Sequence, residues 1–117
     1  MPTFKDFEKV ADLLEEQSRT LPDSQREVAL RRAISTIYYG VFWEVRERLR
    51  KRGYKIRERQ PHSTILRILQ TDFPDVYADM LELKKRRETA DYQADWKPSL
   101  KFYRRVKHLA KLILKGV

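Results

Sequence analysis

The strongest constraint on the fold of this chain is a helical repeat of apolar residues between residues 24 and 51. The repeat recurs every three or four positions, which is the spacing of one helix face, and it continues for about five turns. Its members are Leu30, Ala33, Ile34, Ile37, Tyr38, Val41, Val45 and Leu49. Asp23 or Ser24 is expected to cap the helix, with Glu27 three residues after Ser24 as in a capping box. Gly53 is expected to end it.

A second, shorter stripe runs along another face of the same segment. It consists of Ser35, Tyr39, Trp43 and Arg46, with Phe42 as the alternative to Trp43. A helix with apolar and aromatic residues on two faces contacts neighbours on more than one side. We therefore expect this helix to be central in the fold.

The rest of the chain predicts four further helices and no strand. They are expected at residues 3–19, at 61–71, at 74–88, and from Pro98 or Ser99 to about Leu114. Residues 89–97 are weakly periodic and are expected to form a connection. The predicted fold is all-α, with five helices in an up-and-down bundle and a single domain spanning residues 1–117.

Several classes of protein are disfavoured by the composition. The chain has no cysteine, so neither a disulfide framework nor a cysteine-based metal site is expected. His62 and His108 are isolated, so we expect no metal site, and three glycines do not supply a glycine-rich phosphate loop. No apolar run approaches the roughly 18 residues of a membrane span, and the first residues lack the apolar core of a signal peptide. We expect a cytoplasmic protein without a cofactor.

The net charge of +9 is distributed unevenly along the chain. Residues 1–27 carry seven acidic side chains against four basic ones, which leaves +12 for the remaining residues. Residues 46–59 alone contain eight Lys and Arg side chains against two glutamates. Such asymmetry indicates an anionic partner for the basic part, although a solvated surface or an acidic protein partner would give the same pattern.

Arg87 continues the apolar stripe of the fourth predicted helix. The stripe is Val76, Met80 and Leu83, with Arg87 one turn later. Arg86, by contrast, forms an ordinary surface pair with Glu82. An arginine that points into a bundle or an interface needs an anion. The candidates are Asp91 in a structural ion pair, a glutamate elsewhere, or a ligand phosphate.

Aromatic and basic residues alternate on one side of the long helix. They are Tyr39, Trp43, Arg46 and Arg50. This arrangement suits base stacking and phosphate contact, and it suits a helix–helix dimer interface equally well. We favour an interface at Tyr39 and Trp43, with Arg46 and Arg50 as anion-binding candidates. His62, at the predicted start of the third helix, is a further anion-binding candidate, or else a surface or capping residue.

Three segments together resemble the HEPN domain superfamily. They are Arg-Arg-Ala-Ile-Ser-Thr-Ile-Tyr-Tyr-Gly-Val-Phe at residues 31–42, Pro-His-Ser-Thr-Ile-Leu-Arg-Ile-Leu at 61–69, and Arg-Glu-Thr-Ala-Asp-Tyr at 87–92. The last segment matches the Arg-x-x-Ala-Asp-Tyr signature of the small stand-alone branch, and the resemblance covers about residues 24–115. It implies a four- to five-helix bundle that commonly dimerises. Relatives are often encoded beside a minimal nucleotidyltransferase as toxin–antitoxin pairs, or belong to RNA-targeting defence systems.

Many HEPN proteins are metal-independent endoribonucleases with an Arg-x(4–6)-His motif paired across the dimer. Transferred residue by residue, Arg87 matches the arginine, while Asp91 or Tyr92 occupies the place of the histidine. A carboxylate there repels phosphate, and an ordinary tyrosine is a poor base at neutral pH. Arg87, Asp91 and Tyr92 are therefore the candidate catalytic residues of a chain that lacks the usual histidine.

The sequence thus favours a HEPN-type RNA- or nucleotide-binding protein, homodimeric, and one half of a toxin–antitoxin or defence pair. Two alternatives remain open. One is a non-catalytic module that contacts a nucleotidyltransferase partner. The other is an atypical endoribonuclease. Neither a metal nor a membrane is an expected partner.

Overall fold

A computed structural model describes residues 2–117. It contains five α-helices and no strand within these residues. The helices are α1 (Phe4–Ser18), α2 (Asp23–Lys51), α3 (Pro61–Asp72), α4 (Pro74–Tyr92) and α5 (Leu100–Gly116). The prediction of an all-α fold with five helices is confirmed.

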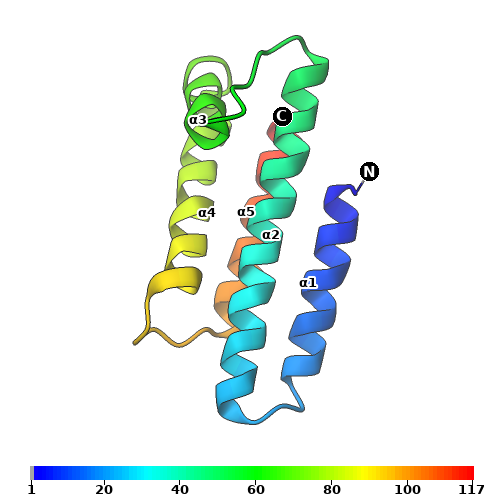
Figure 1. The fold of residues 1–117 in the computed structure, drawn as a ribbon, viewed down its shortest axis with the longest axis vertical. Helices are drawn as coiled ribbons and strands as arrows, with labels where there is room; N and C mark the ends of the chain where they lie inside the picture. Colours follow the sequence, from blue (N-terminus) through cyan, green and yellow to red (C-terminus); the bar gives the residue numbers. More distant parts are fainter. Residues whose placement is uncertain (1) are drawn as a thin grey trace.

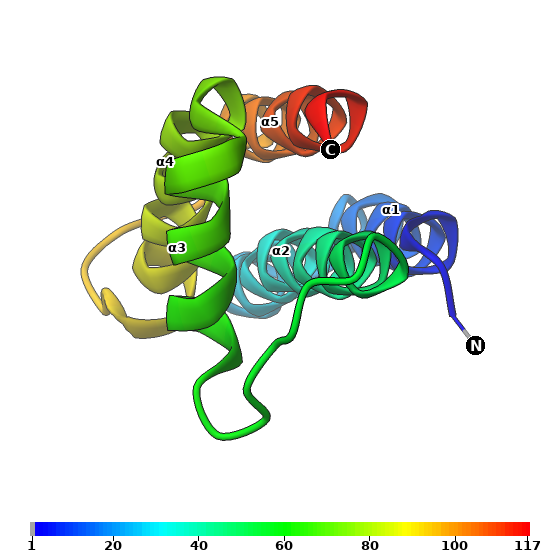
Figure 2. The same ribbon diagram turned by 90° about the horizontal axis from the view of Figure 1, so that it is seen from above.

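The four longer helices alternate in direction, as in an up-and-down bundle, with α3 lying across them near one end (Figure 1). Helix α2 contacts α1, α4 and α5, and α3 packs on α4. Viewed from above, α5 covers one side of α2, and no helix of residues 2–117 covers the opposite side (Figure 2). Helix α2 is therefore central, as predicted, and one of its faces is open.

The main stripe of α2 forms the core of the bundle. All eight of its predicted members are buried, from Leu30 to Leu49. Close packing of α1 on α2 depends on Gly40, because a Cβ at this position would lie 2.6 Å from the Cβ of Phe7. Helix α2 ends at Lys51, and Gly53 follows two residues later with a φ of +95° that suits glycine best, as predicted for the end of the helix.

The predicted side-chain cap of α2 is wrong. The residue before the helix is Pro22, and neither Ser24 nor Asp23 caps its first turn. Residues 22–26 are exposed, so water can accept hydrogen bonds from the free N–H groups of the first turn. In α1 the capping arrangement does form, since the Asp6 carboxylate accepts a hydrogen bond from the backbone N–H of Thr3 at 2.8 Å.

The predicted end of α4 is also wrong, because the helix continues through residues 89–92. Arg31 of α2 explains the extension. Its guanidinium donates hydrogen bonds to the carbonyls of Ala90 at 2.9 Å and Gln93 at 2.7 Å, and also to the carbonyl of Trp96. The first of these bonds satisfies a carbonyl in the last turn of α4, and the other two hold the connection that follows the helix. Four residues thereby join the helix that carries Arg87.

Two basic side chains of α5 are neutralised by carboxylates of neighbouring helices. Lys107 lies 2.9 Å from a carboxylate oxygen of Asp12 on α1, and Arg105 lies 3.1 Å from Glu82 on α4. Tyr103 is buried and donates a hydrogen bond to Asp12 at 2.7 Å. Within residues 2–117, every helix is too short or too polar to cross a bilayer.

Candidate functional site

Arg87 lies at the centre of the candidate site. The stripe of α4 is buried along its whole length, and Arg87 itself is only 9% exposed. The spacing of the stripe turns its side chain towards α2, where the guanidinium carbon lies 4.9 Å from the ring centroid of Tyr38 and 5.8 Å from that of Tyr39. Both distances are typical of cation–π contacts. The prediction that Arg87 points into the bundle is confirmed.

The guanidinium of Arg87 is incompletely paired. Its Nη1 lies 3.5 Å from Oδ2 of Asp91, which is longer than the 2.7–2.9 Å typical of a strong charge-assisted hydrogen bond. The same Oδ2 lies 3.4 Å from the Ser35 hydroxyl. The Nε of Arg87 is buried and has no acceptor among residues 2–117. One donor of the buried guanidinium is therefore unused within the described part of the chain.

His62 joins the same cluster from the first turn of α3. Its ring stacks on Phe42 of α2 with the centroids 4.1 Å apart, and its Nδ1 lies 2.9 Å from the Tyr38 hydroxyl. Because Arg87 also contacts Tyr38, one buried tyrosine separates the histidine from the arginine. The structure thus places His62 in the cluster, rather than leaving it free on the surface.

The protonation states in the cluster follow from burial and charge. Burial raises the pKa of Tyr38 to about 12, although Arg87 opposes the shift, so the hydroxyl keeps its proton at neutral pH. Burial, with help from Arg87 and Lys84, lowers the pKa of His62 below its ordinary value of 6.5. A neutral His62 that accepts a hydrogen bond from the Tyr38 hydroxyl at Nδ1 carries its own proton at Nε2. The imidazole can then donate a hydrogen bond to a bound anion.

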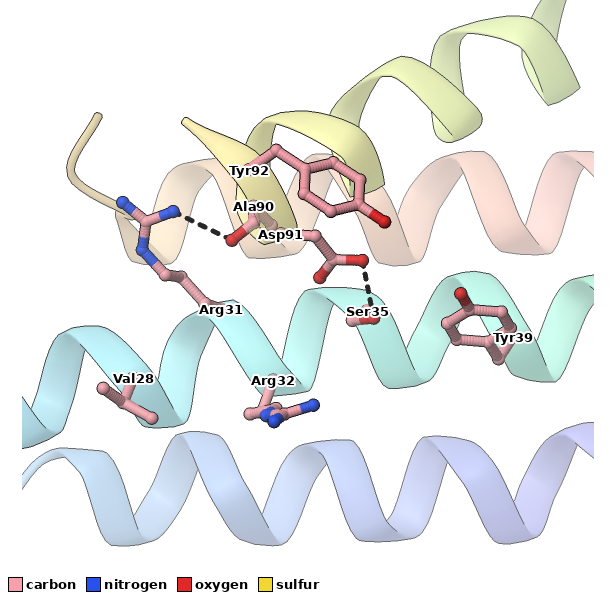
Figure 3. Close-up of a pocket in the computed structure, with 8 residues that line it drawn as sticks. All are labelled: Val28, Arg31, Arg32, Ser35, Tyr39, Ala90, Asp91 and Tyr92. Carbon is pink, nitrogen blue, oxygen red and sulfur yellow. Dashed lines mark hydrogen bonds between the residues drawn. The ribbon is translucent and has the colours of Figure 1, made fainter. Parts of the chain in front are cut away.

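A cleft of about 340 Å³ opens beside Asp91, between α2 and the end of α4 (Figure 3). Its lining residues are Val28, Arg31, Arg32, Ser35, Tyr39, Ala90, Asp91 and Tyr92. Tyr92 is 75% exposed, and Tyr39 is 43% exposed. The extension of α4 brings Asp91 and Tyr92 to this cleft as helical residues. His62 of α3 lies near Arg87 through their shared contact with Tyr38, whereas Tyr92 lines the cleft.

The other predicted residues lie farther along α2. Arg46 and Arg50 follow Tyr39 by about two and three turns, on the same side of the helix. The guanidinium of Arg46 lies over the Trp43 ring at 5.9 Å, and Arg50 forms a loose pair with Glu47 at 3.8 Å. The interface at Tyr39 and Trp43 stays a prediction.

Sequence reasoning missed the polar role of Tyr38, which it assigned to the core. A tyrosine in an otherwise aliphatic stripe is a usable signal, because a buried hydroxyl needs a polar partner. That partner, His62, is 24 residues away in the sequence. Residues 2–117 contain no cluster of three or more His, Asp or Glu side chains suited to a metal ion.

Comparisons with protein-family models, with curated proteins and with solved structures find no match to this chain. The relation to HEPN domains therefore remains a hypothesis that rests on the three sequence segments. The contacts around Arg87 are independent of that resemblance.

Proposed function

We propose that this protein binds single-stranded RNA, with a backbone phosphate held by Arg87 and His62. The observation that carries the proposal is the buried guanidinium of Arg87, which has one loose carboxylate partner and an Nε without an acceptor. Burying a charge that is poorly paired costs stability, unless a ligand completes the pairing. A phosphate oxygen has the charge and the geometry to do so.

Charge and shape around the cluster support a polyanion rather than a small anion. The chain carries a net charge of +9. Exposed basic residues, Lys51, Lys55, Arg57 and Arg59, precede His62 in the segment that leads into α3. RNA that enters the cluster would extend along this segment, and Tyr39 offers an exposed ring for base stacking.

Binding is tested by fluorescence anisotropy with a labelled RNA of about ten nucleotides. We expect affinity to fall steeply between about 50 and about 200 mM salt, because phosphate contacts release counterions. Arg87→Ala should weaken binding about tenfold or more, since a charge-assisted contact is lost. Arg86→Ala is the matched control, because Arg86 is already paired with Glu82 at 2.8 Å. RNA affinity that is independent of salt and of Arg87 would refute the proposal.

A second candidate function is RNA cleavage, and the connection from Arg87 through Tyr38 to His62 favours it. Cleavage by acid–base catalysis needs a histidine near the reacting hydroxyl, and a phosphate held by Arg87 would lie close to His62. Cleavage of single-stranded RNA by the wild type, abolished in both His62→Ala and Arg87→Ala, would support it. Equal, non-zero cleavage by the wild type and both variants would exclude these residues from catalysis.

We further propose that the protein is a homodimer in the cytoplasm. We propose that it forms one half of a toxin–antitoxin or defence pair. The uncovered face of α2 (Figure 2) supports an interaction with a second copy. Val28, Tyr39 and Trp43 lie on one side of this helix by their spacing, and Val28 and Tyr39 are exposed. Sedimentation analysis of the wild type and of Trp43→Glu tests the dimer, which should dissociate in the variant. If RNA binding is absent, contact with a nucleotidyltransferase partner becomes the favoured function.

A further inference from the structure

The cleft beside Asp91 differs chemically from the phosphate site that it adjoins. Asp91 is an acceptor-only group, and its Oδ2 is already shared between Arg87 and Ser35. Its Oδ1 has no hydrogen-bond donor among residues 2–117, and the side chain remains 23% exposed at the cleft. This carboxylate repels phosphate and attracts N–H groups. A ligand that fills the cleft should therefore present donors.

Two tyrosines stand at the cleft from different helices. Tyr39 comes from α2 and Tyr92 from α4, on either side of the Asp91 carboxylate (Figure 3). Both rings are substantially exposed, and exposed aromatic rings beside a polar floor are suited to a flat heteroaromatic group. The helical turn that carries Tyr92 is held to α2, because Arg31 donates a hydrogen bond to the carbonyl of Ala90 two residues earlier.

Basic side chains at the cleft have separate roles. Arg31 donates hydrogen bonds to backbone carbonyls in the last turn of α4 and in the α4–α5 connection. Arg32 is exposed and forms no ion pair within residues 2–117, so it can bind a phosphate next to a ligand in the cleft. The cleft thus combines stacking surfaces, one carboxylate acceptor and one free cation.

We propose that this cleft binds one base of the RNA and prefers guanine. The Watson–Crick edge of guanine presents two adjacent donors, N1–H and the N2 amino group, to a single carboxylate. Uracil presents one N–H between two carbonyl oxygens, which a carboxylate repels. Adenine and cytosine each offer one amino group beside an acceptor nitrogen. The proposal rests on the RNA-binding function, and it assigns the base to Asp91 while Arg87 and His62 hold a phosphate.

The test compares RNAs of equal length and charge by anisotropy. An oligouridine with one central guanosine should bind about tenfold more tightly than oligouridine alone, since a bidentate base contact gives discrimination of this order. Replacing that guanosine by inosine, which lacks the N2 amino group, should remove most of the gain. In Asp91→Asn the ratio of the two affinities should approach one. The ratio is the readout, because a general change in phosphate affinity cancels from it.

Variants of Tyr92 separate stacking from folding. Tyr92 is 75% exposed, so Tyr92→Ala should leave the fold intact and weaken binding of both RNAs severalfold. Tyr92→Phe keeps the ring and should bind as the wild type does. Leu112→Ala, at an exposed residue of α5, is the control that should change nothing.

The outcomes distinguish this inference from the proposed function. Salt-dependent RNA binding with equal affinity for all bases would overturn the guanine site and leave the RNA proposal standing. Binding of free GMP, lost in Asp91→Asn, without binding of any RNA would support guanine recognition and overturn RNA binding. A change of oligomeric state in Tyr92→Ala, without base discrimination in the wild type, would assign the cleft to a protein interface and overturn the inference.

Discussion

Replacing Arg87 by methionine distinguishes a structural arginine from a ligand-binding one. Methionine is unbranched and continues the apolar stripe of α4, so Arg87→Met removes the charge while largely filling the space. If the pair with Asp91 were a well-formed buried ion pair, removing one partner would cost about 3–5 kcal/mol. The observed geometry predicts a much smaller loss.

The expected change follows from the contacts of the guanidinium. Removing the buried Nε that lacks an acceptor should stabilise the protein by about 1–3 kcal/mol, because its desolvation cost disappears. Losing the cation–π contacts with Tyr38 and Tyr39 costs about 1–2 kcal/mol. The 3.5 Å pair with the partly exposed Asp91 contributes about 0–1 kcal/mol. These terms nearly cancel, so stability should stay within about 1 kcal/mol of the wild type.

The measurement is urea unfolding followed by circular dichroism, together with RNA binding on the same samples. We expect Arg87→Met to keep the unfolding midpoint and to lose RNA affinity about tenfold or more. A loss of more than about 3 kcal/mol with unchanged RNA affinity would make Arg87 a structural residue and refute the reasoning.

Four further predictions concern other contacts. Burial lowers the pKa of His62 in the folded protein, so the unfolded chain takes up a proton at a higher pH than the folded protein does. The free energy of unfolding should therefore fall as pH drops below 6.5 in the wild type. It should not fall in this way in His62→Phe. A bound phosphate favours the protonated ring of His62, so RNA affinity should rise as pH falls from about 8 to about 6. Gly40→Ala should lower the free energy of unfolding by about 1–3 kcal/mol, measured in urea, because its Cβ would meet Phe7 at 2.6 Å. Arg31→Ala should speed amide hydrogen exchange at residues 89–93, where the end of α4 loses donors for its carbonyls.

Much of the fold could be predicted because helical periodicity is local. The stripe of α2 indicated which face is buried, and the stripe of α4 placed Arg87 inside the bundle. The 4-residue spacing of Arg87 and Asp91 correctly suggested a pair that forms if the helix continues. In each case the signal and the contact lie on the same helix.

Contacts between helices could not be read from the same patterns. Sequence spacing alone did not bring His62 to Tyr38, because that contact depends on α3 crossing the end of the bundle. Nor did weak periodicity near residue 90 reveal the last turn of α4, since the donors that complete it come from Arg31 on α2. Burial of one face needs only the 3.6-residue period, whereas a site assembled from three helices needs their relative positions. The sequence by itself determined the five helices, the inward-pointing arginine and its carboxylate partner, and the tertiary structure decided which histidine and tyrosines surround it.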